Sequence, residues 1–491
     1  MRKTSETGYP VSDGTAKAAK PAALTPDICV IGAGGDGVAL AIAAAGFGVP
    51  VVLIERGAIG GDRGPLATQA LVAIAARAQA LRNAAGRGPA AAEPQPHPAQ
   101  IHDHVQRALA ADRANHSAER LAALGIIVIR GEARFTSRST VTVDGRPIKA
   151  RRFVIATGAR IAPPAIAGLD TVPLLHESDL AGLTRLPERP IIVGGAGVAL
   201  AQALRRLGPA ASLVASEELL AGHDDEAATI LRRRLLREGL ELHENSTPLR
   251  VERARSGLRL ILTTPSGEKT IEGSHLILCG PRRPAIETLD LDFAGIRHDA
   301  SGIAVDRGLR TSNRRVYALG ACAGGAAAAL PDRAGDDHIG LLLRSILFRQ
   351  PVRVDPASEP RVIWSRPQVA AVGLTEMGAR KTAGKLRVLR WPFAENAAAQ
   401  AAGETEGFVK AIVDHKGRIL GVTIAGEDAG EQIAPWCIAM RAGLGVGAVA
   451  GMPLPAFARS DASRRAALSF HATLTTRPAL RRLIGFLRRF G

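Results

Sequence analysis

Residues 27–55 read DICVIGAGGDGVALAIAAAGFGVPVVLIE, and this stretch decides the fold of the first part of the chain. The apolar run at residues 27–31 predicts a short strand, and the glycine-rich residues 32–37 predict a turn into an apolar helix that ends near Gly46. A second apolar run at residues 51–54 predicts the next strand, which ends at Glu55. The order of strand, glycine turn, helix and strand indicates a parallel βαβ unit.

The turn carries the spacing GxGxxG at Gly32, Gly34 and Gly37, with Glu55 roughly twenty residues beyond the middle glycine. In a dinucleotide-binding unit the first glycine permits the tight turn, the second lets the backbone approach a pyrophosphate, and the third lets helix and strand pack closely. The helix N-terminus then faces phosphate, and the acid can accept a hydrogen bond from a ribose hydroxyl. The stretch predicts a dinucleotide site; a glycine turn without a ligand is the alternative.

The bulk composition predicts a large globular protein. With 491 residues, of which 46% are hydrophobic, the chain can form two or three domains. The formal net charge of +17 could attract acidic surfaces, nucleic acid or anionic cofactors. Aromatic residues are only 3% of the chain, which leaves few stacking platforms, and no nucleic-acid-binding motif is present. We therefore expect no nucleic-acid partner.

The four cysteines, Cys29, Cys279, Cys322 and Cys437, are widely spaced and form no CxxC pair. This spacing predicts neither a disulfide framework nor a zinc site, and no histidine pair indicates another metal site. The expected location is the reducing cytoplasm. Residues 1–25 lack the apolar core of a signal peptide and are expected to form a disordered tail, and no transmembrane segment is predicted.

The rest of the chain shows a second α/β pattern followed by a change in composition. A proline-rich break at residues 86–98 precedes an expected helical stretch at 102–124. Expected strands follow at 126–130, 140–143, 153–156, 191–193 and 276–278, with a helix through 202–207. From about Val352 the strands become longer and alternate, as at 408–413 and 419–424, which predicts an α+β domain.

Seven stretches together match one known family. They are GAGGDG at 32–37, IERGAIGGD at 54–62, GEARF at 131–135, VIATGAR at 154–160, TSNRRVYALG at 311–320, VAAVGLTE at 369–376 and RILGVTIAGEDAGE at 418–431. On these residues the chain resembles the pyridine nucleotide-disulfide oxidoreductases, most closely the mercuric-reductase-like and dihydrolipoamide-dehydrogenase-like members. The resemblance runs from about Asp27 to Leu468, nearly the whole chain.

The resemblance implies an α/β fold with two Rossmann-like dinucleotide-binding domains and a C-terminal α+β dimerisation domain, assembled as a homodimer. The expected boundaries are an FAD-binding domain at 26–170 and 289–351, an inserted NAD(P)-binding-like domain at 171–288, a dimerisation domain at 352–474 and a basic amphipathic tail at 475–491. FAD is the implied cofactor. Its expected contacts are Gly32, Ala33, Gly34, Gly37, Glu55 and Arg56 for the diphosphate and ribose, Ala133 for adenine, and Thr157, Gly158, Gly320 and Ala321 for the flavin end.

The stretch IGGDRGPLATQAL at 59–71 departs from the family. Relatives keep two redox cysteines here, separated by four residues. Aligning both Gly60-Gly61 and Ala70-Leu71 with theirs leaves this chain three residues short and places Arg63 and Pro65 at the two cysteine positions, with Gln69 at a family lysine. A thiolate is the nucleophile of dithiol exchange, and neither side chain can replace it. The disulfide relay is therefore expected to be absent. Cys322 lies beside the expected flavin and is the one thiol that could act instead, although core packing is the favoured interpretation.

Other departures affect the second nucleotide and proton transfer. The second glycine loop, at 194–199, is two residues short, and Ala199 replaces a family glutamate. The following strand ends in Ala215 and Ser216, which supply neither an acid for a ribose diol nor an arginine for a 2′-phosphate. Ala456 stands where relatives carry a histidine or tyrosine base. Binding of NAD(P)H is therefore doubtful, and Ala321 removes one expected hydrogen bond to FAD.

The tail at 475–491 places Leu480, Leu483, Ile484 and Leu487 on one helical face, with arginines opposite. It could make weak contact with an anionic membrane surface, and docking against the dimer body is the favoured alternative. For the whole protein, the sequence predicts an FAD-dependent oxidoreductase without the disulfide relay, acting on a small molecule that the sequence does not name. The competing hypothesis is a non-catalytic dimeric FAD-binding or scaffold protein.

Overall fold

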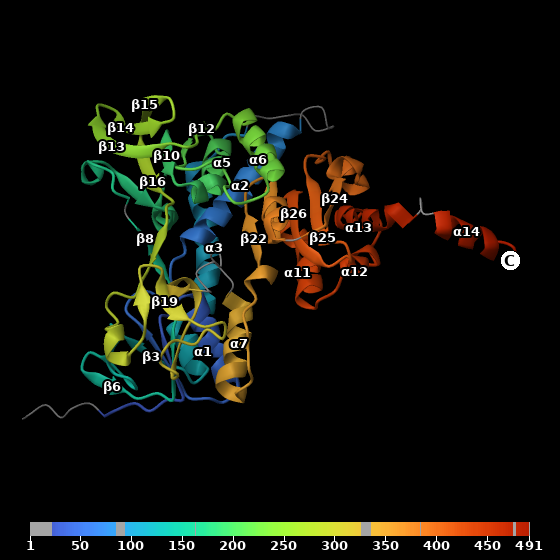
Figure 1. Cartoon of the computed structure of the whole chain (residues 1–491). Coiled ribbons are helices and arrows are strands. Elements are labelled where there is room, and N and C mark those ends of the chain that lie inside the picture. The colour runs from blue at the N-terminus through green and yellow to red at the C-terminus, as the bar shows by residue number, and fades with distance from the viewer. Residues whose placement is uncertain are drawn as a thin grey trace, which may run out of the picture.

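The computed structural model describes residues 22–84, 94–162, 164–325, 335–382, 384–474 and 478–490. In Figure 1 these residues form three sheet-containing units and one separate C-terminal helix. The first unit contains β1, α1 and β3, the second contains β10, β16 and α5, and the third contains β25, β26 and α13.

The first unit is a parallel sheet of five strands in the order β20-β7-β1-β2-β3. The strands span Ile28–Ile31 (β1), Val51–Glu55 (β2), Ile127–Arg130 (β3), Arg152–Ile155 (β7) and Val316–Ala318 (β20). All four residues of the central strand β1 are buried, as expected for a parallel strand covered on both faces. The predicted βαβ unit is confirmed.

Helices cover one face of this sheet and a small antiparallel sheet covers the other. The helices are α1 (Gly35–Gly46), α4 (Ala118–Ala123) and α7 (Gly335–Phe348), and α1 and α7 lie side by side in Figure 1. The other face meets β4 (Arg134–Ser137), β5 (Thr140–Val143) and β6 (Arg146–Ile148), where Phe135 packs edge-on against Phe153. A further small sheet joins β18 (His298–Asp299), β19 (Gly302–Val305) and β21 (Ala323–Gly325), with η4 (Leu291–Ala294) and η5 (Gly320–Cys322) nearby.

The second unit is another five-stranded parallel sheet, in the order β12-β11-β10-β16-β9. Its strands are β9 (Leu174–His176), β10 (Pro190–Val193), β11 (Ser212–Val214), β12 (Glu241–His243) and β16 (His275–Leu278). An antiparallel sheet, β13 (Thr247–Ala254), β14 (Gly257–Thr264) and β15 (Gly267–Gly273), extends it. The pair β8 (Ala159–Ile161) and β17 (Arg282–Pro284) carries the chain into and out of this unit, with η1 (Leu169–Thr171) on the entry side.

Two long helices that leave the first unit pack against the second. Helix α2 (Gly64–Asn83) and α3 (Pro98–Asn115) share one apolar core with α5 (Val198–Arg206), η2 (Glu177–Gly182) and α6 (Asp225–Arg237). The helix expected at 102–124 is corrected to two helices. Pro98 occupies the first position of α3, which ends at Asn115. Ser117 then caps the start of a new helix, α4, by accepting a hydrogen bond from the Arg120 amide.

The third unit is an antiparallel sheet in the order β22-β23-β26-β25-β24. Its strands are β22 (Pro360–Ile363), β23 (Gln368–Gly373), β24 (Leu386–Pro392), β25 (Phe408–Asp414) and β26 (Ile419–Gly426). Short helices pack on it: η6 (Pro356–Ser358), α8 (Glu376–Thr382), η7 (Phe393–Glu395), α9 (Ala397–Ala402), α10 (Ala429–Gln432), α11 (Ala434–Arg441), α12 (Val446–Ala450), α13 (Asp461–Leu468) and η8 (Ser469–Leu474). The predicted fold class, two Rossmann-like units and a C-terminal α+β unit, is confirmed.

The structure describes part of each of the two expected terminal tails. Residues 1–21 of the expected disordered segment lie outside the described residues. Leu24 is held to the first unit, because its amide donates to the Pro147 carbonyl and its carbonyl accepts from the Lys149 amide. At the other end, α14 (Pro478–Leu487) confirms the helix expected in the tail.

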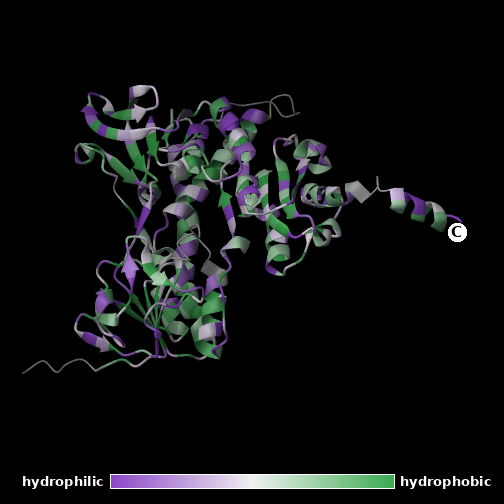
Figure 2. Ribbon diagram, viewed as in Figure 1, coloured by the Kyte–Doolittle hydropathy of each residue, from purple (hydrophilic) through white to green (hydrophobic). Residues whose placement is uncertain are grey.

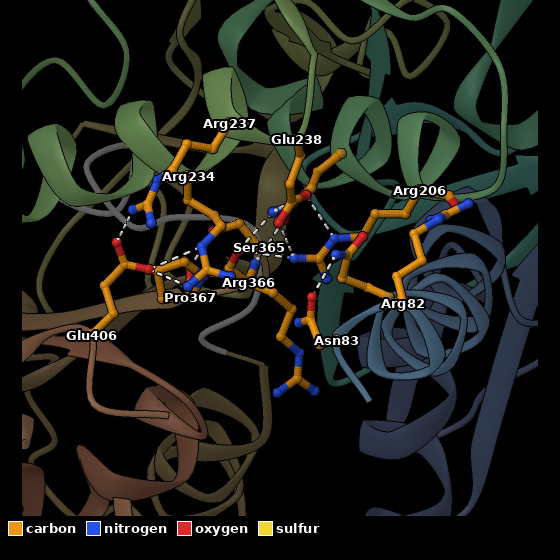
Figure 3. Close-up of polar contacts among 12 residues, drawn as sticks. Arg82, Asn83, Arg206, Arg234, Arg237, Glu238, Ser365, Arg366, Pro367 and Glu406 are labelled. Carbon is orange, nitrogen blue, oxygen red and sulfur yellow. Dashed lines mark hydrogen bonds and ion pairs between the residues drawn. The ribbon is translucent and has the colours of Figure 1, made fainter. Parts of the chain in front are cut away.

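A polar cluster joins the second and third units (Figure 3). Arg206 and Glu238 form a two-pronged ion pair at 2.6 and 2.8 Å, with side chains only 5% and 8% exposed. The Gln202 amide group binds both the carbonyl and the amide of Arg366, and Arg234 and Arg237 converge on Glu406. These contacts fix the second unit against the third.

We expect Glu238→Ala to lower the free energy of unfolding by about 3 to 5 kcal/mol, because Arg206 would be left as a buried charge without its partner. Thermal unfolding followed by circular dichroism measures the change. The control is Glu272→Ala, since Glu272 pairs with Arg259 on an open surface where such a pair contributes at most about 1 kcal/mol. Equal shifts in the two variants would contradict the structural role given to Glu238.

Candidate functional site

Close packing accounts for two of the three motif glycines at the turn between β1 and α1. Gly32 has a φ of +104°, and a Cβ atom there would lie 2.4 Å from the Ala156 carbonyl oxygen. A Cβ atom at Gly37 would lie 2.0 Å from the carbonyl oxygen of Gly32. Both positions exclude any larger residue, because the obstructing atoms are backbone. The sequence assigned the same two roles to these glycines.

Gly34 differs from its two neighbours in the motif. It caps α1 with an extended backbone, at a φ of −67° that any residue can adopt. A Cβ atom there would meet nothing within 4 Å. The fold itself therefore gives no steric reason for glycine at this position. Close approach of a ligand to the backbone at the start of a helix would supply one.

Glu55 at the end of β2 braces this loop. Its Oε2 atom accepts a hydrogen bond of 2.7 Å from the Ala33 amide, and its Oε1 atom accepts one of 2.7 Å from the Gly57 amide. The sequence predicted a bond to ribose, and the structure adds this bracing of the backbone. A carboxylate has about four acceptor positions, so two remain for a ribose diol.

Five of the predicted contact residues line one pocket beside this loop. They are Gly32, Glu55, Arg56, Ala133 and Thr157, together with Ile31, Ile54, Gly131, Glu132, Ala285, Thr288 and Leu289. The Thr157 hydroxyl oxygen is buried and makes no hydrogen bond of ordinary geometry among the described residues, and the Cys322 thiol is close enough for Thr157 to act against the rise of the pKa of that thiol. At the rim, Arg56 pairs with Glu132 at 3.4 Å, and a hydrogen bond from Arg134 lowers the pKa of Glu132. Gly158 follows Thr157 with a φ of +68°.

The turn at Gly320 and Ala321 lies against the first glycine loop. A Cβ atom at Gly320 would lie 2.5 Å from Oδ2 of Asp36, so the Asp36 carboxylate reaches this turn. Ala321 is exposed and carries no polar group in place of the family's aspartate. Sequence reasoning missed Asp36. Its signal was an acidic residue inside GxGxxG, where its charge meets the end of the helix that favours anions.

Arg63, which the sequence analysis expected at the position of the first family cysteine, is held in place at the start of α2. Its Nε atom lies 3.0 Å from the Asp112 carboxylate, and Nη2 donates to the Ile59 carbonyl at 2.9 Å. The guanidinium covers Gly60, where a Cβ atom would lie 2.3 Å from Nη2. Pro65 lies in the first turn of α2 and can neither bind a metal nor exchange electrons. The structure thus puts a fixed cation at this position.

A second polar group surrounds the same helix end. Thr68 donates to Glu177 at 2.7 Å, and Arg282 lies 3.5 Å from Glu177 and 3.6 Å from Asp62. These residues come from α2, η2 and β17, so they join the first and second units. Their charges balance in part, which leaves Arg63 paired with Asp112 as a separate ion pair.

The thiols lie away from this group or are closed to solvent. Cys322 is fully buried, and its Sγ atom lies 3.2 Å from the Leu319 carbonyl and 3.4 Å from that of Ile155. Burial raises the pKa of Cys322, and also that of Cys29. Burial raises the pKa of Cys279 to about 12, and the Glu177 charge acts in the same direction. None of the four cysteines forms a disulfide bond, and Cys437 is the half-buried one.

In the glycine loop of the second unit, close packing explains why Gly194 and Gly197 are glycines. A Cβ atom at Gly194 would lie 2.1 Å from the Cys279 carbonyl oxygen, and one at Gly197 would lie 2.4 Å from the Ile192 side chain. After β11, Ala215 is buried and Ser216 is exposed. Glu244, the carboxylate that follows β12, already binds Arg232 and the Leu219 amide. Burial works to raise the pKa of Glu244, yet these bonds outweigh it and lower that pKa.

No group of three or more His, Cys, Asp or Glu side chains in the described ranges is placed to hold a metal ion. Among the helices described, none combines the length and the apolar composition needed to cross a membrane.

Comparison with known proteins gives similar sequences over nearly the whole chain. A mercuric reductase of Streptomyces lividans is 31% identical over 462 residues, covering 90% of this chain and 96% of the relative. A dihydrolipoyl dehydrogenase of Thermus scotoductus is 31% identical over 435 residues, covering 85% of this chain and 92% of the relative. Among solved structures, LpdA from Mycobacterium tuberculosis has the same fold, with a TM-score of 0.81 at 24% identity over 91% of this chain and 99% of that one.

The family patterns divide the chain where the sheets do. The pyridine nucleotide-disulphide oxidoreductase pattern matches residues 26–340, which hold the two parallel sheets. The dimerisation domain of that family matches residues 359–462, which hold the antiparallel sheet. Because the glycine loop, both Rossmann-like units and the C-terminal unit all agree with these matches, the chain belongs to the pyridine nucleotide-disulphide oxidoreductase family.

Proposed function

We propose that this protein is an FAD-dependent oxidoreductase that works without a disulfide relay. The observation that carries the FAD site is Gly34, a glycine that the packing of the fold does not require. The buried Thr157 hydroxyl oxygen and the two spare acceptor positions of Glu55 support the same site. Family membership supports FAD as the dinucleotide. When bound, FAD would accept a hydride and pass its electrons on.

The chain's own residues would hold that cofactor from one end to the other. The amides at the start of α1 would bind the diphosphate, and Glu55 would bind the ribose while keeping the loop closed. The backbone around Ala133 would meet adenine. Thr157 would offer its hydroxyl at the flavin end, and the turn at Gly320 would lie beside it.

The absence of a disulfide relay is the finer part of the proposal. Arg63 and Pro65 occupy the aligned cysteine positions, and three of the four cysteines are buried. A buried thiol with a raised pKa has almost no thiolate at neutral pH, so it does not attack a disulfide. We therefore infer direct transfer between flavin and a small-molecule acceptor. The fixed guanidinium of Arg63 would favour an acceptor that carries or develops negative charge.

The second unit would have to bind the electron donor. Nothing that replaces the family's acid or arginine follows β11 directly, and Ala199 carries no carboxylate. We propose that NAD(P)H binding is weak. The domain boundaries given above, a homodimer formed through the third unit, and a cytoplasmic location belong to the same proposal.

The second candidate is a dimeric FAD-binding or scaffold protein without turnover. The observation that favours it is the Asp36 carboxylate in the first turn of α1, together with the loss of a polar group at Ala321. A carboxylate near the phosphate-binding end of a helix repels a diphosphate, and both features weaken FAD binding. A protein that binds FAD but does not exchange electrons would match this candidate.

The purified protein should bind FAD, and Gly34→Ala should weaken that binding at least about tenfold (~1.4 kcal/mol) because the added methyl group keeps the diphosphate away from the backbone. Fluorescence quenching of added FAD measures the dissociation constant. Gly46→Ala is the matched control, since its Cβ atom also meets nothing within 4 Å but lies at the other end of α1.

Equal FAD affinity in the Gly34→Ala variant and the native protein would contradict the proposed site. Unchanged thermal unfolding of both variants without FAD would show that the effect comes from the ligand. Anaerobic addition of NADH or NADPH to the FAD-loaded native protein then separates the two candidates. Bleaching of the flavin absorbance supports the oxidoreductase, and a flavin that only dithionite can reduce supports the non-catalytic protein.

Thiol titration should show that the native protein has no reactive dithiol. With a disulfide reagent at about pH 8, near the ordinary thiol pKa, we expect at most Cys437 to react, because burial raises the pKa of the other three. After unfolding in guanidinium all four should react. Rapid reaction of two thiols in the native state, or only two thiols after unfolding, would show that a cysteine pair is present after all.

Asp36→Asn should tighten FAD binding by about fivefold, since it removes roughly 1 kcal/mol of repulsion between a carboxylate and the diphosphate. The same fluorescence titration measures the change, and Asp103→Asn on the exposed side of α3 is the charge-matched control. Weaker binding in the Asp36→Asn variant would instead show that this carboxylate accepts a hydrogen bond from the cofactor.

A further inference from the structure

Helix α14 has two chemically different faces. At about 100° per residue, its apolar side chains fall within one arc of roughly 160°, and its arginines fall within the opposite arc. The apolar set is Leu480, Leu483, Ile484, Phe486, Leu487 and, just beyond the helix, Phe490. The basic set is Arg481, Arg482, Arg488 and Arg489. Figure 2 shows the hydrophilic and hydrophobic parts side by side on this helix.

The apolar face of α14 is open in the single chain. Leu483, Ile484 and Leu487 are 51%, 49% and 56% exposed, and Phe490 is 75% exposed. No residue of the helix is buried, and Figure 1 shows α14 standing away from the three units. Phe486 and Phe490 contact each other, with ring centroids 5.0 Å apart. A cluster of several exposed apolar side chains is typical of an interaction surface.

The charge of the C-terminal region indicates what covers this face. No Asp or Glu follows Asp461 in the sequence, whereas the last fifteen residues contain five arginines. The side chains of this region therefore carry a net positive charge beside an apolar stripe. This combination is typical of a helix that lies in the interface of an anionic bilayer.

We propose that α14 binds the protein to the surface of membranes that contain anionic lipids. The apolar arc would enter the boundary between headgroups and acyl chains, and the arginines would contact lipid phosphates and carboxylates. The binding would be reversible and sensitive to salt, because one short helix buries little apolar area and its charges are screened within a Debye length. This proposal is independent of the FAD site.

Two other partners fit the helix less well. A second copy of the chain, including the partner in the proposed homodimer, carries the same net charge of +17 and therefore offers no net negative charge to the arginines. Nucleic acid would satisfy the arginines but leave the leucine and phenylalanine side chains in water. An anionic bilayer is the partner that satisfies both faces at once.

Flotation of the full-length protein with lipid vesicles tests the proposal. We expect the protein to float with vesicles of phosphatidylcholine and phosphatidylserine at about 0.1 M salt, and to be released from them at about 1 M salt. With phosphatidylcholine alone, binding should be at least tenfold weaker. Arg481→Gln with Arg482→Gln should weaken binding to the anionic vesicles about 25-fold, from roughly 1 kcal/mol for each charge.

Two further variants make the result specific to α14. Arg185→Gln with Arg314→Gln removes the same charge at exposed sites outside the tail and should bind as the native protein does. Leu483→Gln with Leu487→Gln keeps the charge but should bind at least tenfold more weakly. Equal flotation with both kinds of vesicle, or equal loss in the two arginine pairs, would overturn the proposal. Conversion of a native dimer to a monomer by the leucine pair, seen by light scattering, would also overturn it.

Discussion

The packing of the β1–α1 turn against β7 is the constraint on which the first unit depends. Gly37 brings α1 against the carbonyl of Gly32, and Gly32 in turn lies against the Ala156 carbonyl. Neither contact tolerates a Cβ atom. The turn therefore holds the start of α1 at the edge of the sheet, and Glu55 keeps the loop closed from the next strand. Every other contact proposed for FAD is positioned relative to this point.

The same sheet edge shows how the chain differs from its relatives. The glycine turn proposed to hold a dinucleotide lies beside the start of α2, which carries Arg63 paired with Asp112, and our proposed alignment places a family cysteine at Arg63. A fixed ion pair cannot transfer electrons, but it contributes to the electrostatic potential of the site. Asp36 acts in the opposite sense, since it brings negative charge to the phosphate-binding end of α1. In the proposed function, the balance of these charges would set the affinity for FAD and the kind of acceptor that can approach.

The second and third units are joined by buried polar contacts in addition to a small apolar cluster of Ala227, Val369, Phe408 and Ala425. Lys410 on β25 lies within 3.0 Å of both Asp224 oxygens at the start of α6, and Arg206, Glu238 and Arg366 form the neighbouring group. Buried pairs of this kind lose stability sharply when one partner is removed. The second unit is thus held on the third as well as on the first, so its position is part of the fold.

The sequence by itself determined the βαβ unit, the strands near residues 191–193, 276–278, 408–413 and 419–424, the late α+β unit and the roles of Gly32 and Gly37. These follow from local periodicity and from glycine positions, which neighbouring residues decide. Only the tertiary structure decided that Asp36 reaches Gly320, that Arg63 pairs with Asp112, and that α2 and α3 pack on the second unit. Those contacts join residues far apart in the chain, and no local pattern encodes such distances. Spatial proximity, set by the packing of whole elements, determines them.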